Sequence, residues 1–228
     1  TINHAQPDLI IVHQDFMPLI EEIKSDFEHE IVIIPIGYGE KYEDWISSSP
    51  TGFNFPEFDE NRTATLFYTT GTTGDPKGVT YSHRQLVLHT LGLLAGFGSF
   101  SGDSGLHRDD VYMPLTPLFH VHGWGFPYAA SMLGLRQVYP NRYDPETILR
   151  LIDSEAVTFS HCVPTVLSML LDHPNSEKVN LSRWKVIIGG SALSKSLQSR
   201  ASELGIRLHA AYGMSETCPF LTVADLSS

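Results

Sequence analysis

Short apolar runs rich in β-branched residues alternate along this chain with segments of helical periodicity. A run of four to eight such residues is typical of a strand, and strands that are separated by helices form parallel sheets. The pattern therefore predicts an α/β fold of mostly parallel sheets flanked by helices. The expected strands are Leu9–His13, Ile31–Pro35, Thr65–Tyr68, Val111–Leu115, Arg136–Tyr139, Val157–His161, Lys185–Ile188 and Arg207–Ala210.

Three of the expected helices carry recognisable start signals. Ser82, with Gln85 three residues on, forms a capping-box pattern. Asp144 before Pro145 is an N-cap followed by a first-turn proline. Ser194 opens a third helix, which we expect to stop at Gly205.

Composition excludes several classes of protein. The chain has 228 residues, of which 42% are hydrophobic and 18% charged, so it can bury a sizeable core and is not disordered. A net charge of −11 argues against nucleic-acid binding. Two cysteines cannot form a disulfide framework, and the cytoplasm is the expected compartment. The long uncharged stretches 85–102 and 113–135 are interrupted by glycine or proline, so we expect no transmembrane segment.

The most informative segment runs from Tyr68 to Gly78, with the sequence Tyr-Thr-Thr-Gly-Thr-Thr-Gly-Asp-Pro-Lys-Gly. It follows an expected strand and offers backbone N–H groups, hydroxyls and Lys77 to a polyphosphate. A Walker loop would need Ser or Thr after Gly-Lys, whereas Lys77 lies between Pro76 and Gly78. The Gly-x-Gly spacing of a Rossmann fingerprint is also missing.

This loop closely resembles the signature loop of the AMP-forming, adenylate-forming enzymes, and three later segments follow in that family's order. They are Pro117-Leu118-Phe119-His120, Gly189-Gly190-Ser191-Ala192 and Tyr212-Gly213-Met214-Ser215-Glu216-Thr217. The run from Phe119 to Ala130 looks most like fatty-acyl-CoA synthetases. The resemblance implies a fragment of the family's large N-terminal domain. Residues 1–60 would be part of a first α/β subdomain with a connector, and residues 61–228 the nucleotide- and acyl-binding core, without the C-terminal lid domain.

The resemblance implies roles for individual residues in binding ATP and Mg²⁺. Tyr212 would stack on adenine and Ser215 would contact the α-phosphate, while Thr69 and Glu216 would hold the metal ion. Ala210 and Ala211 stand where relatives often carry a polar residue or glycine, so only their backbone carbonyls would serve. The nucleotide-binding set is Thr69, Thr70, Gly71, Thr72, Thr73, Gly74, Lys77, Gly190, Ala210, Ala211, Tyr212, Gly213 and Ser215.

A second set of residues is expected to bind the acid. By resemblance, His120 lies beside the reacting carboxylate and Trp124 is an aromatic gate at the mouth of the acyl pocket. Two histidines two residues apart, His120 and His122, could also share a zinc ion, but no further ligand has a matching spacing. The expected substrate pocket is His120, Trp124, Val163, Pro164, Gly189 and Gly190.

The resemblance thus implies ATP-dependent activation of a fatty acid to an acyl-adenylate and then to acyl-CoA. Lys77, His120, Ser215 and Glu216 would be the catalytic residues. In the family a lysine and a ribose-binding aspartate follow the segment matched here, so we expect this chain alone to be a weak catalyst. An aryl- or other carboxylate-CoA ligase on the same scaffold and a non-catalytic nucleotide-binding module are the alternatives. A homodimer and a peripheral membrane contact stay open.

Overall fold

The computed structural model describes residues 1–37, 39, 41–69, 74–141 and 143–226. The chain divides into two compact units. The first consists of residues 1–59 and 70–77, and the second of residues 60–69 and 78–228.

The first unit contains a small parallel sheet. Strands β1 (Leu9–His13) and β2 (Val32–Ile36) pair with Leu9 opposite Val32. Ile20 and Ile34 are its buried residues. The bounds of β1 are those expected from the sequence, and β2 begins one residue later than expected. The helices of this unit are α1 (Ile2–Ala5), α2 (Met17–Ile23) and α3 (Lys41–Ser47).

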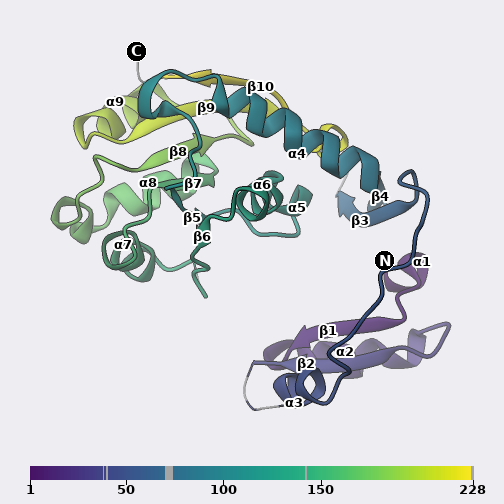
Figure 1. Ribbon diagram of the computed structural model, residues 1–228. Helices are drawn as coiled ribbons and strands as arrows, with labels where there is room; N and C mark the ends of the chain where they lie inside the picture. The colour runs from purple at the N-terminus through teal and green to yellow at the C-terminus, as the bar shows by residue number, and fades with distance from the viewer. Residues whose placement is uncertain (38, 40, 70–73, 142, 227–228) are drawn as a thin grey trace. The chain divides into compact units, whose positions relative to one another are not determined.

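The second unit is built on a six-stranded sheet in the order β10-β9-β8-β7-β5-β6 (Figure 1). All neighbouring pairs are parallel except β10 with β9, which is antiparallel. The strands of this sheet are β5 (Val111–Pro114), β6 (Arg136–Gln137), β7 (Phe159–Cys162), β8 (Lys185–Ile188), β9 (Arg207–Gly213) and β10 (Phe220–Asp225). A separate two-stranded sheet joins β3 (Thr63–Thr69) and β4 (Lys77–Ser82).

Helices cover both faces of the six-stranded sheet. Because successive strand residues point to opposite faces, Val186 and Ile188 pack in one core cluster and Ile187 in another. The first cluster includes Ile148, Leu167 and Ala201 from α7, α8 and α9, and the second includes residues of α4 and α6. The helices are α4 (His83–Gly98), α5 (Val121–Trp124), α6 (Phe126–Leu133), α7 (Pro145–Ser154), α8 (Pro164–Asp172) and α9 (Lys195–Glu203).

The three expected helix starts are confirmed. The Ser82 hydroxyl accepts a hydrogen bond from the backbone N–H of Gln85, whose side chain accepts from the backbone of Ser82 in return. Asp144 caps α7, and Ser194 caps α9. Gly205 follows the end of α9 with a φ of +74°, a left-handed conformation that glycine adopts without a Cβ clash.

Two strands of the second unit were not expected from the sequence. β4 has only two apolar residues, Val79 and Tyr81, in alternation, and it begins with Lys77 and Gly78 of the expected phosphate loop, so its strand signal is weak. β10 is antiparallel to its neighbour and lies at the edge of the sheet. β9 extends to Gly213, three residues beyond the expected end at Ala210, because β10 pairs with this extension. The predicted fold class, α/β with a mostly parallel sheet, is confirmed.

A buried ion pair joins the amino ends of the parallel strands. Lys185 Nζ lies 2.7 Å from a carboxylate oxygen of Asp110 and donates to the carbonyl of Gly105 at 2.8 Å. The Thr158 hydroxyl donates to the other oxygen of Asp110 at 2.7 Å. Both charged side chains are less than a tenth exposed. The pair therefore links the starts of β5 and β8 with the residue that precedes β7.

Among the described residues, no helix has the length and apolar character that crossing a membrane requires.

Candidate active site

The carboxyl ends of β7, β8 and β9 gather most of the residues expected to bind substrate. Parallel strands end at one edge of a sheet, where open α/β folds bind their ligands. Val163 follows β7, Gly189 and Gly190 follow β8, and Tyr212 and Gly213 end β9. The sequence alone could not show that these loops meet; the strand order does.

A cavity of about 270 Å³ lies at this edge, beside Trp124. The expected acid-binding residues His120, Trp124, Val163, Gly189 and Gly190 line it, together with Ser215. Pro164 is not among the lining residues, because it forms the first turn of α8. Residues that the sequence did not single out for the acid complete the wall: Thr116, Val121, Ala211, Gly213, Met214, Pro219 and Phe220.

A larger cavity of about 590 Å³ lies beside Tyr212, a residue that is 61% exposed. Ala210 and Tyr212 line only this cavity, whereas Phe220 lines the smaller one. Ala210 pairs with Ile188, which belongs to the core cluster on the α9 side of the sheet. The two cavities therefore open on opposite faces of the strand ends. They share Gly190, Ala211 and Gly213, so a single ligand can reach over the strand ends into both.

Trp124 is carried by a left-handed turn. Val121, His122, Gly123, Trp124 and Gly125 have φ angles of 45°, 55°, 61°, 60° and 79°. For residues other than glycine, this conformation costs roughly 1–2 kcal/mol each, and such strain is concentrated at ligand-binding sites. The surrounding packing holds the turn in place.

The ring of Trp124 packs against His161 of β7 and against Gly189, which follows β8. It lies 5.2 Å from the imidazole of His161, centroid to centroid, and is only 8% exposed. A Cβ on Gly189 would come within 3.2 Å of the indole, so the missing side chain makes room for Trp124. Gly189, expected in the substrate pocket, thus lines the cavity and also makes room for the tryptophan.

His161 is itself fully buried, and its Nε2 lies 2.7 Å from the Tyr112 hydroxyl. Burial lowers the pKa of His161 from 6.5 to about 3 and raises the pKa of Tyr112 well above 10. Both side chains are therefore neutral near pH 7, and the tautomer of the imidazole decides which of the two groups donates. Trp124 thus packs against a buried pair of neutral side chains, of which His161 makes the contact.

A tight turn after β9 carries Ser215 and Glu216. The Tyr81 hydroxyl, on β4, donates a hydrogen bond of 2.6 Å to the carbonyl oxygen of Ser215. Burial, with Cys218 and the charge of Glu216 nearby, raises the pKa of Tyr81 to about 12. The hydroxyl therefore keeps its proton, and the turn is fixed to the strand that follows the expected phosphate loop.

Thr69 lies on the same side of β3 as this contact. The ring of Phe67 stacks on Tyr81 with centroids 5.9 Å apart, and residues two apart on a strand share a face. Phe67, Tyr81 and Cys218 belong to one buried cluster. The end of β3 and the turn that carries Glu216 are thus both joined to this cluster, through Phe67 and Tyr81.

The expected phosphate-loop residues Thr70, Gly71, Thr72 and Thr73 lie outside the described residues. Gly74, with a φ of +118°, and Lys77, the first residue of β4, are exposed. The phosphate-binding roles of the whole set, from Thr69 to Lys77, stay predictions.

The chemistry of the donors fits a magnesium ion better than zinc. His122 packs edge-on against Phe67 with centroids 4.9 Å apart, and its Nε2 is buried, while His120 is exposed in the smaller cavity. In the part of the chain that the structure describes, no three His, Cys, Asp or Glu residues form a metal-binding group. Hard oxygen ligands such as Thr69 and Glu216, completed by phosphate oxygens and water, suit magnesium.

Several residues that build the site were missed in the sequence. Tyr81 holds the Ser215 turn and Phe220 closes the smaller cavity, but neither lies in a recognisable motif. The left-handed turn did leave a signal, because glycine occupies positions 123 and 125 and favours positive φ.

The sheet is mostly parallel, and two adjoining cavities lie at its carboxyl edge, one beside an exposed tyrosine and one beside a buried tryptophan. Open α/β folds bind their ligands at this edge. The family model described as "AMP-binding enzyme" matches residues 1–228. The chain therefore belongs to the AMP-binding enzyme family, which confirms the resemblance found in the sequence.

Individual relatives agree with this assignment. The chain is 37% identical to a long-chain-fatty-acid–CoA ligase of Thermus thermophilus over 96% of its own length and 40% of the relative's. An anthranilate CoA ligase in complex with anthranoyl-AMP matches with a TM-score of 0.84 and 25% identity, over 100% of this chain and 45% of that one. An N-terminal domain from Mycobacterium tuberculosis, FACL13, has the same fold with a TM-score of 0.81 and 20% identity, over 97% and 54%. The chain thus spans about half or less of the proteins it matches.

Proposed function

We propose that this chain is the part of an AMP-forming acid–CoA ligase that binds ATP and a fatty acid. The observation that carries the proposal is the pair of cavities that meet at Gly190, Ala211 and Gly213. An acyl-adenylate has a flat base at one end and an apolar tail at the other. Tyr212 would stack on the base in the larger cavity, and the tail would pass Trp124 in the smaller one.

The proposed reaction takes place where the cavities join. A carboxylate oxygen attacks the α-phosphorus, the bond to pyrophosphate breaks, and an acyl-adenylate forms. The sulfur of coenzyme A then attacks the acyl carbon, and AMP leaves. Ser215 lines the smaller cavity and would donate to the α-phosphate, while His120 would lie beside the carboxylate. Such chemistry depends on positioning and on neutralising charge.

Thr69 and Glu216 would hold magnesium, and Lys77 would approach the phosphates. When bound, the ion neutralises phosphate charge. The Tyr81 hydrogen bond would keep the Ser215 turn at a fixed distance from β4, so that the hydroxyl of Ser215 does not have to be ordered when substrate binds.

The wall of the acid-binding cavity favours a fatty acid. Val121, Trp124, Val163 and Phe220 line it, and none of the described residues in its wall carries a carboxylate that could bind the amine of an amino acid. The relative bound to anthranoyl-AMP supports an aryl acid as the second candidate. An aryl acid would fill only the cavity beside Trp124.

Calorimetry with stable acyl-adenylate analogues tests the proposal. The probes are acyl-sulfamoyl adenosines that carry a dodecanoyl or an anthraniloyl group, with AMP as the reference. We expect the dodecanoyl analogue to bind more tightly than AMP and than the anthraniloyl analogue. Tyr212→Ala should weaken all three ligands, because it removes the surface for the base. Trp124→Ala should weaken only the two acylated ligands.

Two outcomes of the binding experiment would count against a fatty acid as the substrate. A dodecanoyl analogue that binds no better than AMP would contradict an acyl site, and tighter binding of the anthraniloyl analogue would favour the aryl acid. For ATP, Glu216→Gln should remove most of the gain in affinity that magnesium gives; an unchanged magnesium effect would rule out Glu216 as the ligand.

A further inference from the structure

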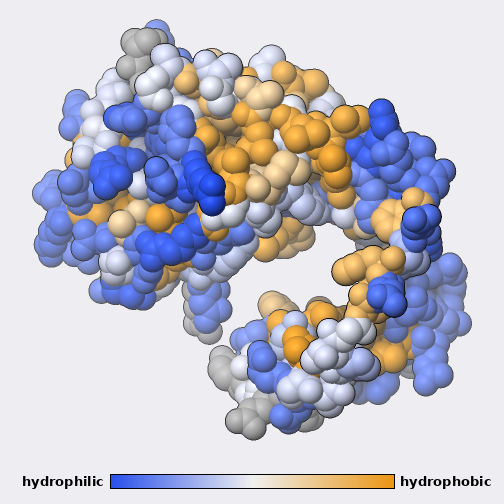
Figure 2. All heavy atoms as spheres, viewed as in Figure 1, coloured by the Kyte–Doolittle hydropathy of each residue, from blue (hydrophilic) through white to orange (hydrophobic). Residues whose placement is uncertain are grey.

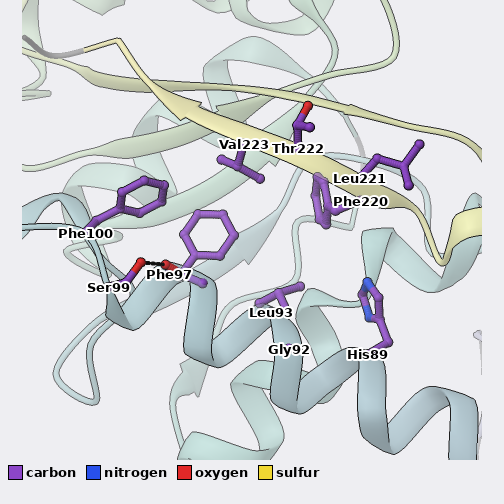
Figure 3. A pocket seen from close by; sticks show the side chains of 11 residues that line it. His89, Gly92, Leu93, Phe97, Ser99, Phe100, Phe220, Leu221, Thr222 and Val223 are labelled. Carbon is purple, nitrogen blue, oxygen red and sulfur yellow. Dashed lines mark hydrogen bonds between the residues drawn. The ribbon is translucent and has the colours of Figure 1, made fainter.

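A third cavity, of about 400 Å³, lies between α4 and β10 on the same side of the sheet as Trp124 (Figure 3). In Figure 2 apolar residues gather along this part of the second unit. Side chains of both elements point into the cavity. Most of them are apolar: Leu93, Phe97, Phe100, Phe220 and Val223.

Phe220 connects this cavity to the active site. Its side chain lines both the cavity beside Trp124 and the cavity beside α4. Its ring centroid lies 6.0 Å from that of Trp124 and 5.5 Å from that of Phe126. From Phe220, β10 continues through Thr222 to Val223 along the third cavity. Phe220 is therefore the apolar wall that the two cavities share, and the cavity beside α4 continues from it along β10.

The opposite wall is built partly from backbone alone. Gly92 and Gly96 of α4 line the cavity, and they are four residues apart, about 6 Å along the helix. A Cβ built on either residue would meet no atom within 4 Å. Glycine inside a helix is less stable than alanine, so neither helix propensity nor local packing explains its presence at both positions. What both glycines provide is space in the cavity.

We propose that Gly92 and Gly96 determine the longest acyl chain that this protein accepts. The inference rests on the proposed function, and it adds that the tail passes Phe220 and lies between β10 and α4. Figure 3 shows Gly92 near Phe220, while Ser99 and Phe100 lie at the far end of the cavity. A side chain at Gly92 therefore blocks the path earlier than one at Gly96.

The test uses acyl-sulfamoyl adenosines with 4, 8, 12 and 16 carbons in the acyl group and measures their dissociation constants by calorimetry. The variants are Gly92→Leu and Gly96→Leu. The matched control is Gly98→Leu, because Gly98 belongs to the same helix, has no atom within 4 Å of a built Cβ and does not line the cavity. Each methylene kept in water instead of the cavity costs about fourfold in affinity.

In the wild type and in Gly98→Leu, affinity should rise with chain length until the cavity is full. In Gly92→Leu the rise should stop at a shorter chain than in Gly96→Leu, and the longest analogue should lose at least tenfold. The four-carbon analogue should stay within about twofold of the wild type in every variant.

Two results would overturn the inference while leaving the proposed function intact: equal weakening of all chain lengths in the glycine variants, or no change at any length. If no analogue binds the wild type at all, the proposed function itself fails, and the inference with it. Thermal melting separates these outcomes from misfolding. Gly92→Ala and Gly96→Ala should melt at or above the wild-type temperature, because alanine is the better helix former, and should still shorten the preferred chain.

Discussion

At the scale of single residues, the hydroxyl of Tyr81 and the imidazole of His161 hold the site without any expected contact with substrate. Tyr81 fixes the turn that carries Ser215, and His161 supports Trp124 from below. Both are polar groups in apolar surroundings, so each depends on a single partner.

Tyr81→Phe removes the donor to the Ser215 carbonyl and leaves that oxygen without this partner. We expect a loss of about 1 kcal/mol in the free energy of unfolding, measured by urea denaturation, and weaker binding of magnesium-ATP. Tyr128→Phe is the control, since it deletes a hydroxyl that is also partly buried, with Cys218 close by, but that forms no hydrogen bond with any described residue. Equal effects of the two substitutions would show that the hydrogen bond has no special role.

His161 makes the stability depend on pH in a defined direction. Its pKa falls from 6.5 to about 3 on folding. Between these pH values, the imidazole is therefore protonated in the unfolded chain and neutral in the folded chain. The free energy of unfolding is unaffected by this group above pH 6.5 and should decrease by about 1.4 kcal/mol per pH unit below it. Urea denaturation between pH 7 and 4.5 measures the slope.

In the His161→Gln variant, the free energy of unfolding should change with pH by about 1.4 kcal/mol per pH unit less than in the wild type. His107→Gln, at an exposed histidine, is the control for the substitution itself. A His161→Gln slope equal to that of the wild type would mean that the imidazole is protonated in the folded protein.

At the scale of elements, the left-handed turn at residues 121–125 places Trp124. Gly125 ends it, and the ring of His89 on α4 packs against the Cα of this glycine: a Cβ there would lie 2.7 Å from a ring carbon. The turn is thus supported by α4, the helix that also carries Gly92 and Gly96.

Gly125→Ala should combine backbone strain with a clash, whereas Gly134→Ala, also at positive φ but with no atom within 4 Å of the new Cβ, should show the strain alone. We expect a loss of roughly 1–2 kcal/mol for Gly134→Ala and a larger loss for Gly125→Ala. Adding His89→Ala to Gly125→Ala should recover the difference. A Gly125→Ala protein as stable as Gly134→Ala would contradict the packing of His89 on the turn.

The elements also show what sequence patterns can predict. The caps at Ser82, Asp144 and Ser194 were predictable because they depend on side chains within three residues of each other. β10 was not, because its place depends on pairing with β9 and not on its own composition. For the same reason the cavity beside α4 was not predicted: its walls come from segments more than 100 residues apart.

At the scale of the whole molecule, the site and the main buried ion pair occupy opposite ends of one sheet. Asp110 and Lys185 join the strands where they begin, and the cavities lie where the strands end. The motifs identified the family of the site, but nothing in the sequence pairs Asp110 with a lysine 75 positions away.

Lys185→Met should leave the buried carboxylate of Asp110 without its ion-pair partner, with a loss of about 3–5 kcal/mol in the free energy of unfolding. Arg84→Met is the control: it breaks the Arg84–Glu60 pair, whose side chains are at least half exposed, and should cost about 1 kcal/mol or less. Chemical denaturation of both variants measures the difference. Similar losses in the two variants would indicate that breaking the buried Asp110–Lys185 pair costs no more stability than breaking an exposed ion pair.

The opposed cavities at the strand ends have one more consequence. Alternation along β9 directs Tyr212 to one face, while Phe220 and Trp124 lie on the other. Of the residues that the structure describes, only Gly190, Ala211 and Gly213 border both cavities. Side chains that select the acid can therefore be exchanged without disturbing the opposite face. Proteins with this sheet can therefore evolve a different acid specificity on the face of Trp124 while the face of Tyr212 stays unchanged.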